Sequence, residues 1–153
     1  MKTADVIIVG SGASGLFNAL FLPQDYKVIV ITKKEVEESD SFLAQGGISA
    51  LKNPEDYDSY FEDTMKAGHY ENDKGAVEKM IKESPQIIQD LKDFGVRFDL
   101  KDGEIEFTRE GGHSTFRILH HEDLTGKEIT SHLYEEAKKR DNITIMENCT
   151  MID

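Results

Sequence analysis

The chain has 153 residues and a net charge of −12, with 38% hydrophobic and 31% charged residues. This length and mix indicate about one soluble globular domain that can bury a core, rather than a disordered chain. The acidic balance argues against a nucleic-acid partner and against an anionic membrane surface, because both bind clustered lysine and arginine. No apolar stretch approaches the ~20 residues that a membrane-spanning helix needs.

The N-terminus and the cysteine content indicate a compartment. Met1–Asp5 has no signal-peptide layout and leads almost directly into an apolar run. Cys149 is the single cysteine, so we interpret it as a partly buried structural thiol that forms no internal disulfide. The sequence therefore predicts a cytoplasmic protein.

The first elements form a strand–helix–strand pattern. Asp5–Val9 is apolar and rich in β-branched residues, which predicts a strand of a parallel sheet that is buried on both faces. Gly10–Gly15 follows, and helical spacing then continues up to Pro23. Lys27–Ile31 is a second apolar strand. All of this fits within roughly thirty residues, the size of one βαβ crossover.

The middle of the chain is predicted to be mainly helical. Ser39–Ala50 has no clean period and contains two adjacent glycines, so we expect an ordered loop. Apolar spacing predicts helices over Asp56–Ala67 and Asp73–Phe94. Within the second helix, Pro85 predicts a kink, or a break with a fresh start for which Ser84 is a possible cap.

A glycine and a hairpin pattern follow that helix. Gly95 predicts the C-terminal stop of this helix. Val96–Thr108 predicts a hairpin around Asp102-Gly103, because apolar residues alternate on both arms. Arg109–His121 is polar and glycine-bearing, and it predicts irregular structure.

The last elements return to the first pattern. Lys127–Arg140 predicts a one-faced helix, and Ile143–Met146 predicts a third strand. The expected order is β-α-β within residues 1–50, a helical insertion with a hairpin at 51–121, and a helix and strand at 122–153.

The glycine loop is suited to an anion. Gly10 allows a tight turn out of the first strand, Gly12 allows close approach of backbone to a pyrophosphate, and Gly15 allows close packing of helix on sheet. Unpaired N–H groups and the positive end of the helix dipole then face the ligand. The loop predicts that the pyrophosphate of a dinucleotide cofactor binds here.

The residues after the second strand leave the identity of the dinucleotide open. An Asp or Glu that binds the ribose is expected ~20 residues beyond the glycine loop. That place holds Thr32, Lys33 and Lys34, and the nearest acid is Glu35. Either Glu35 reaches back to the ribose, or Thr32 and Lys33 hold it. A lysine there would also suit the 2′-phosphate of NADP.

Several motifs in register are more specific than the glycine loop alone. They are V-G-S-G-A-S-G-L, I-T-K, L-A-Q-G-G-I-S-A, T-R-E-G-G-H-S, R-I-L-H and T-G-K-E-I. With these motifs the chain resembles the succinate dehydrogenase and fumarate reductase flavoprotein family, and within it the enzymes that oxidise L-aspartate.

The resemblance implies a fold and an activity. The fold would be an α/β, Rossmann-like FAD-binding domain with a helical insertion and a β-hairpin, whose parallel sheet is incomplete in this chain. The activity would be FAD-dependent oxidation of L-aspartate to iminoaspartate, the first step of bacterial NAD biosynthesis. Oxygen or fumarate would reoxidise the flavin, and quinolinate synthase would consume the product.

The resemblance also implies roles for individual residues. Lys33 would lie beside the ribose, Thr150 and Met151 would lie at the adenine end, and Glu110 would orient the substrate. The residues that would contact the pyrophosphate are Ser11, Gly12, Ala13 and Ser14, and Gly10 and Gly15 would complete the cofactor-binding glycine loop. The residues that would line the flavin and its phosphates form a flavin loop: Asp40, Ser41, Phe42, Leu43, Ala44, Gln45, Gly46 and Gly47.

Two further implications concern FAD attachment and metals. Covalent members of the family link FAD to a histidine at the place of Asp40, which cannot form that bond, so we expect non-covalent FAD. His113, His120 and His121 have no cysteine or carboxylate at a usual ligand spacing, so we expect no metal site.

Members of the resembled family are several times longer than this chain. Their capping domain, C-terminal helical domain and catalytic arginine would lie outside it, so we expect a fragment that is inactive alone. Its bare sheet edge would favour self-association. Two alternatives stay open: a soluble fumarate reductase-type flavoprotein with non-covalent FAD, and a stand-alone NAD(P)-binding domain without oxidase activity.

Overall fold

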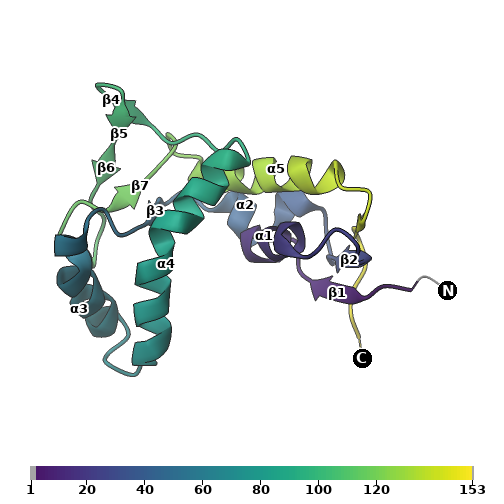
Figure 1. The fold of residues 1–153 in the computed structure, drawn as a ribbon, viewed down its shortest axis with the longest axis horizontal. Coiled ribbons are helices and arrows are strands. Elements are labelled where there is room, and N and C mark those ends of the chain that lie inside the picture. The colour runs from purple at the N-terminus through teal and green to yellow at the C-terminus, as the bar shows by residue number, and fades with distance from the viewer. Residues whose placement is uncertain (1–2, 153) are drawn as a thin grey trace. The chain divides into compact units, whose positions relative to one another are not determined.

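The computed structural model describes residues 3–152 and divides the chain into two compact units (Figure 1). The first unit combines the chain up to Gln45 with Phe94–Val96 and the chain from Leu124 onward. The second unit consists of Gly46–Asp93 and Arg97–Asp123. The N-terminal unit is therefore completed by the C-terminal part of the chain.

The first unit contains a parallel three-stranded sheet. Its strands are β1 (Val6–Val9), β2 (Val28–Ile31) and β8 (Ile143–Met146), in the order β1-β2-β8. Val28 pairs with Val6 on one side and with Ile143 on the other. The three predicted strands are confirmed, and the third strand lies beside the second.

Helices α1 (Ala13–Phe21) and α5 (Thr125–Lys138) pack against each other in the same unit. Ala19 of α1 is buried with Val28 and Val30 of β2 in one apolar cluster. Two short helical segments, η1 (Val36–Glu38) and α2 (Asp40–Leu43), follow β2. The prediction of an uninterrupted loop from residue 39 is therefore wrong for α2, where the Ser39 hydroxyl caps the turn by accepting from the Phe42 N–H at 3.3 Å.

The expectation that β1 is buried on both faces is wrong. Ile7 and Val9 are 62% and 56% exposed, whereas Val6 and Ile8, which alternate with them, are half-buried. Because successive side chains of a strand point to opposite faces, one face of β1 is bare of cover from the described residues. The continuous run of apolar residues predicted the strand correctly. Such a run does not indicate which face of the strand the described helices cover.

The second unit contains two small antiparallel sheets. In one, β3 (Ile48–Ser49), β7 (Ile118–Leu119) and β6 (Phe107–Thr108) lie in the order β3-β7-β6. In the other, β4 (Leu100–Lys101) pairs with β5 (Glu104–Ile105). This hairpin turns at Asp102 and Gly103 with φ angles of 54° and 86°, which confirms the predicted turn.

The three-stranded sheet is a correction to the expected layout. Phe107 belongs to the sheet with β7 rather than to the hairpin, so the predicted hairpin is too long. Ile118 and Leu119 form a buried strand inside a stretch that was expected to be irregular. Each of these strands has two residues, and such short runs show no period in a sequence.

Two helices supply the core of the second unit. The 3-10 turn η2 (Pro54–Asp56) leads into α3 (Tyr57–Ala67), and α4 (Lys74–Asp93) packs beside α3 (Figure 1). Tyr60 and Met65 of α3 are buried with Val77 and Ile81 of α4. None of the helices in residues 3–152 is long and apolar enough to span a membrane.

Helix α4 runs through Pro85 without the predicted fresh start. Pro85 has no N–H to donate to the Ile81 carbonyl one turn back. The Ser84 hydroxyl donates to that carbonyl at 2.7 Å instead, and it also accepts from the Leu51 N–H at 2.9 Å. Ser84 is therefore a side-chain substitute for the missing hydrogen bond rather than a cap. The helix ends before Gly95, whose φ of 91° confirms the predicted stop.

Candidate cofactor site

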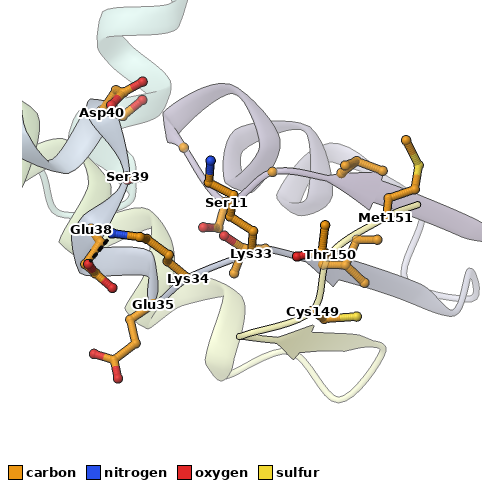
Figure 2. A pocket seen from close by; sticks show the side chains of 16 residues that line it. Ser11, Lys33, Lys34, Glu35, Glu38, Ser39, Asp40, Cys149, Thr150 and Met151 are labelled. Carbon is orange, nitrogen blue, oxygen red and sulfur yellow. Dashed lines mark hydrogen bonds and ion pairs between the residues drawn. The ribbon is translucent and has the colours of Figure 1, made fainter. Parts of the chain in front are cut away.

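A cavity of about 530 Å³ lies in the first unit, where β1 and β2 end (Figure 2). Parallel sheets bind ligands at the carboxyl ends of their strands, so this is the expected place for a cofactor. The predicted site residues that line it come from four segments: Gly10, Ser11 and Gly12; Lys33; Asp40 and Ser41; Thr150 and Met151.

The glycine loop has the geometry that its sequence predicts. Gly10 has a φ of 110°, a conformation that side chains disfavour. A Cβ on Gly15 would lie 2.1 Å from the Gly10 carbonyl oxygen, so only glycine lets α1 start this close to β1. A Cβ on Gly12 would lie 2.8 Å from the Ser41 hydroxyl oxygen, which places the glycine loop against Ser41.

The cavity presents donors that suit an anion. Helix α1 starts at this end, its N-cap Gly12 offers no side-chain hydrogen bond, and its first turn contains no acid. The first N–H groups of a helix have no partner within the helix, and its dipole is positive there. The Ser11 hydroxyl is also buried, with no hydrogen-bond partner among the described residues. Such an orphan costs about 1–3 kcal/mol, which a phosphate oxygen would offset.

Two of the charged residues that follow β2 form an ion pair with each other. Lys34 donates to Glu38 at 2.8 Å, and this hydrogen bond raises the pKa of Lys34 and lowers that of Glu38. Figure 2 shows the Glu35 carboxylate directed away from Ser11 and Lys33. Thr32, Lys33 and Glu35 all line the cavity, and the Glu35 carboxylate is the one directed away from Ser11 (Figure 2).

Hydrogen bonds to backbone groups fix two of the segments around the cavity, the chain after β8 and η1. The Cys149 N–H donates to the Thr32 carbonyl at 2.9 Å, which keeps the chain after β8 beside the end of β2. A Glu147 oxygen accepts from the N–H of the buried Val36 at 3.0 Å and so anchors η1. Glu147 was not predicted as a site residue, and its signal in the sequence is its position directly after the third strand.

Other predicted residues lie outside this cavity. Ser14 and Gly15 line a neighbouring hollow along β1. The Ala44 carbonyl accepts from Gly126 of α5 at 3.1 Å, and a Cβ on Gly126 would lie 2.1 Å from the Ser41 carbonyl oxygen. In the first unit, the remaining predicted residues that do not line the cavity are Ala13, Phe42, Leu43 and Gln45.

In the second unit, Glu110 lies against the glycine pair of the flavin loop. Its Oε1 accepts from the Gly47 N–H at 3.0 Å. A Cβ on Gly46 would lie 3.6 Å and 3.8 Å from the two carboxylate oxygens. The structure therefore joins two motifs that are 63 residues apart in the sequence.

The second unit also contains a buried ion cluster that was not predicted from the sequence. Arg117 has no exposed surface, and all five of its N–H donors have acceptors. Nε and one terminal nitrogen bind the Asp56 carboxylate at 2.8 Å each, and the other terminal nitrogen binds Asp63 at 2.6 Å. Ser59 and His113 accept the remaining two hydrogen bonds.

Both carboxylates of this cluster are held ionised. The hydrogen bond from Arg117 is the main cause that lowers the pKa of Asp56 to about 2, against the opposing effect of burial. For Asp63, burial acts to raise the pKa, but hydrogen bonds from Ser114 and Arg117 together outweigh it and hold the pKa below its ordinary value. Asp56 raises the pKa of Arg117 in return.

Comparison with known proteins places this chain in a protein family. The family model described as "FAD binding domain" matches residues 5–153. Two curated relatives carry the name L-aspartate oxidase. The protein from Clostridium perfringens is 44% identical over 99% of this chain and 35% of its own length. The protein from Clostridium acetobutylicum is 46% identical over 97% of this chain and 35% of its own length.

Two solved structures are similar in fold to this chain. Quinol fumarate reductase from E. coli matches with a TM-score of 0.88 and 25% identity, over 95% of this chain and 26% of its own. Sdh1 of Mycobacterium smegmatis, in complex with UQ1, matches with a TM-score of 0.83 and 28% identity, over 96% of this chain and 28% of its own. The chain spans about a third or less of the length of the proteins that it matches.

Proposed function

Since the chain belongs to the FAD-binding domain family, we propose that its first unit holds the adenosine diphosphate part of FAD in the cavity beside Ser11. The observation that carries this proposal is the buried, unpaired Ser11 hydroxyl beside a helix N-terminus without an acid. Thr32 and Lys33 then hold the ribose, and Thr150 and Met151 lie at the adenine.

The flavin part of the cofactor is assigned to the loop from Asp40 to Gly47. Asp40 is exposed at the start of α2 and has no nucleophilic ring nitrogen, so FAD binds here without a covalent bond. Residues 1–50 and 122–153 then build the cofactor site, and residues 51–121 are an insertion that carries Glu110.

The activity that we propose for the protein containing this chain is oxidation of L-aspartate to iminoaspartate. The support is the 44–46% identity to two proteins named L-aspartate oxidase. FAD supplies the acceptor for the two electrons and the hydrogen that leave the substrate Cα. Glu110 orients the substrate. The Gly47 N–H donates to Oε1 of Glu110 and so fixes that oxygen.

The partners follow from that reaction. Oxygen or fumarate takes the electrons from the reduced cofactor, and a quinolinate synthase in the cytoplasm consumes the product. The exposed Ile7 and Val9 support self-association of the chain when it is isolated. Sedimentation velocity over a range of concentrations tests this, and a single monomeric species throughout would contradict it.

A chimera tests the activity. We expect this chain, joined in place of the matching third of the Clostridium perfringens relative, to oxidise L-aspartate with bound FAD, and the isolated chain to show no turnover. Product formation from L-aspartate, compared with succinate as substrate, is the measurement. A folded, yellow chimera that does not oxidise L-aspartate would contradict the proposed activity. A colourless chain that binds NADP would favour the nucleotide-binding alternative.

A further inference from the structure

The turn that carries Glu110 is anchored on helix α3. Glu110 begins a turn in which the His113 N–H donates to the Glu110 carbonyl at 3.3 Å, and Gly112 has a φ of 85°. A turn built on two glycines has little stiffness of its own, because glycine loses the most conformational freedom on ordering. Contacts outside the turn must therefore fix it.

Asp63 makes those contacts. Its Oδ2 accepts from the Ser114 N–H at 2.7 Å and from the Ser114 hydroxyl at 2.8 Å. The same oxygen accepts from Arg117 at 2.6 Å. Asp63 thus binds the residue directly after the turn and the buried cation that follows it.

Arg117 makes this anchor rigid. Its acceptors Asp56, Ser59 and Asp63 lie at the start of α3 or on it, at a spacing that places them on one face. The Tyr60 ring lies on the same face, with the guanidinium 4.8 Å from its centroid. With all five donors engaged, the guanidinium has one position, and its contact with His113 Nδ1 at 3.1 Å adds a second restraint on the turn.

The other end of the turn holds the flavin loop. Glu110 is itself exposed, so its own packing does not determine where its carboxylate lies. Its acceptor bond to the Gly47 N–H is the contact that joins it to the glycine pair. The chain of contacts therefore runs from α3 through Asp63, Ser114 and Glu110 to Gly47.

From this geometry we infer that Asp63 is a positioning residue: it fixes the Gly111-Gly112 turn so that Glu110 holds the Gly47 amide of the proposed flavin loop in one position. The inference rests on the proposed function, because it assigns Gly47 to the flavin loop. Asp63 touches neither cofactor nor substrate in this role and acts through Glu110.

The test measures hydrogen exchange of the Gly47 amide by NMR in the 153-residue chain, and FAD affinity by titration. We expect Glu110→Ala to speed Gly47 exchange about tenfold, because one hydrogen bond is lost. Asp63→Asn produces a similar increase, and Ser114→Ala produces a smaller one with the ion cluster intact. Asp58→Asn, an exposed position on the same helix, leaves Gly47 exchange unchanged.

The double variant separates positioning from general destabilisation. If Asp63 acts through Glu110, adding Asp63→Asn to Glu110→Ala gives no further increase in Gly47 exchange and no further loss of FAD affinity. Independent, multiplying effects of the two substitutions would overturn the inference, and so would unchanged Gly47 exchange in folded Asp63→Asn and Ser114→Ala chains. Coupling without any FAD binding would instead overturn the proposed cofactor and leave the anchoring of Gly47 by Asp63 standing.

Discussion

Gly15→Ala abolishes measurable FAD binding and destabilises the first unit. The new Cβ would lie 2.1 Å from the Gly10 carbonyl oxygen and 3.1 Å from its carbon. Both atoms belong to backbone, so no side-chain rotation relieves the overlap. Helix α1 must shift away from β1, and the N–H groups at its start then no longer point into the cavity. Overpacking of this kind costs about 1–3 kcal/mol.

Fluorescence titration with FAD and urea unfolding measure these two effects. Gly111→Ala is the matched control, because a Cβ at Gly111 has no neighbour within 4 Å. We expect the control, which introduces no overlap, not to lower the unfolding midpoint. A Gly15→Ala chain that keeps both the affinity and the midpoint of the parent chain would contradict the assigned packing of α1 on β1.

Arg117→Leu unfolds the second unit or lowers its free energy of unfolding by about 3–5 kcal/mol, because it leaves two buried carboxylates without their cation. The side chains of Asp56 and Asp63 are only 8% and 15% exposed. The loss is comparable to the whole stability of many small domains. Lys34→Leu, which removes a solvent-exposed ion pair, is the control and leaves the unfolding midpoint unchanged.

The pH dependence of unfolding identifies the cause. In the parent chain the pKa of Asp56 is held at about 2 in the folded state. A lowered folded-state pKa contributes stability above the unfolded value of about 4, and this stability is lost as the pH falls toward 2. For Arg117→Leu this contribution disappears, and protonation of the two carboxylates as the pH falls raises the stability of the variant relative to the parent chain. Parallel pH profiles of the two chains would contradict the cluster as described.

Local patterns were enough to predict the elements around the cofactor cavity. The first strand, glycine loop, helix and second strand are adjacent in the sequence, and each carries a period or a glycine with a definite mechanical reason. The third strand was equally clear from Ile143–Met146. What these patterns omitted was the exposure of Ile7 and Val9, because cover is a property of neighbouring elements rather than of the strand.

The second unit was less predictable because its contacts are distant in the sequence. Arg117 binds the carboxylates of Asp63 and Asp56, which are 54 and 61 residues away in the sequence. Glu110 accepts a hydrogen bond from Gly47, which is 63 residues away. A single sequence without an alignment shows an arginine, two aspartates and a glycine, but nothing that pairs them. Pro85 was misjudged for a related reason, since the pattern shows its missing N–H but not the Ser84 hydroxyl that replaces it.

The most direct test of the cofactor site is titration of the isolated chain with FAD and with ADP, using Ser11→Ala and Thr130→Val as a matched pair. Both side chains are buried hydroxyls without a partner among the described residues, but Ser11 lines the cavity and Thr130 does not. We predict that ADP competes with FAD, and that Ser11→Ala weakens both ligands about 10–100-fold, because a hydrogen bond to a charged group is lost. Thr130→Val leaves both affinities unchanged. FAD binding that ADP does not displace, or that Ser11→Ala and Thr130→Val affect alike, would contradict the assignment of this cavity to the adenosine diphosphate of FAD.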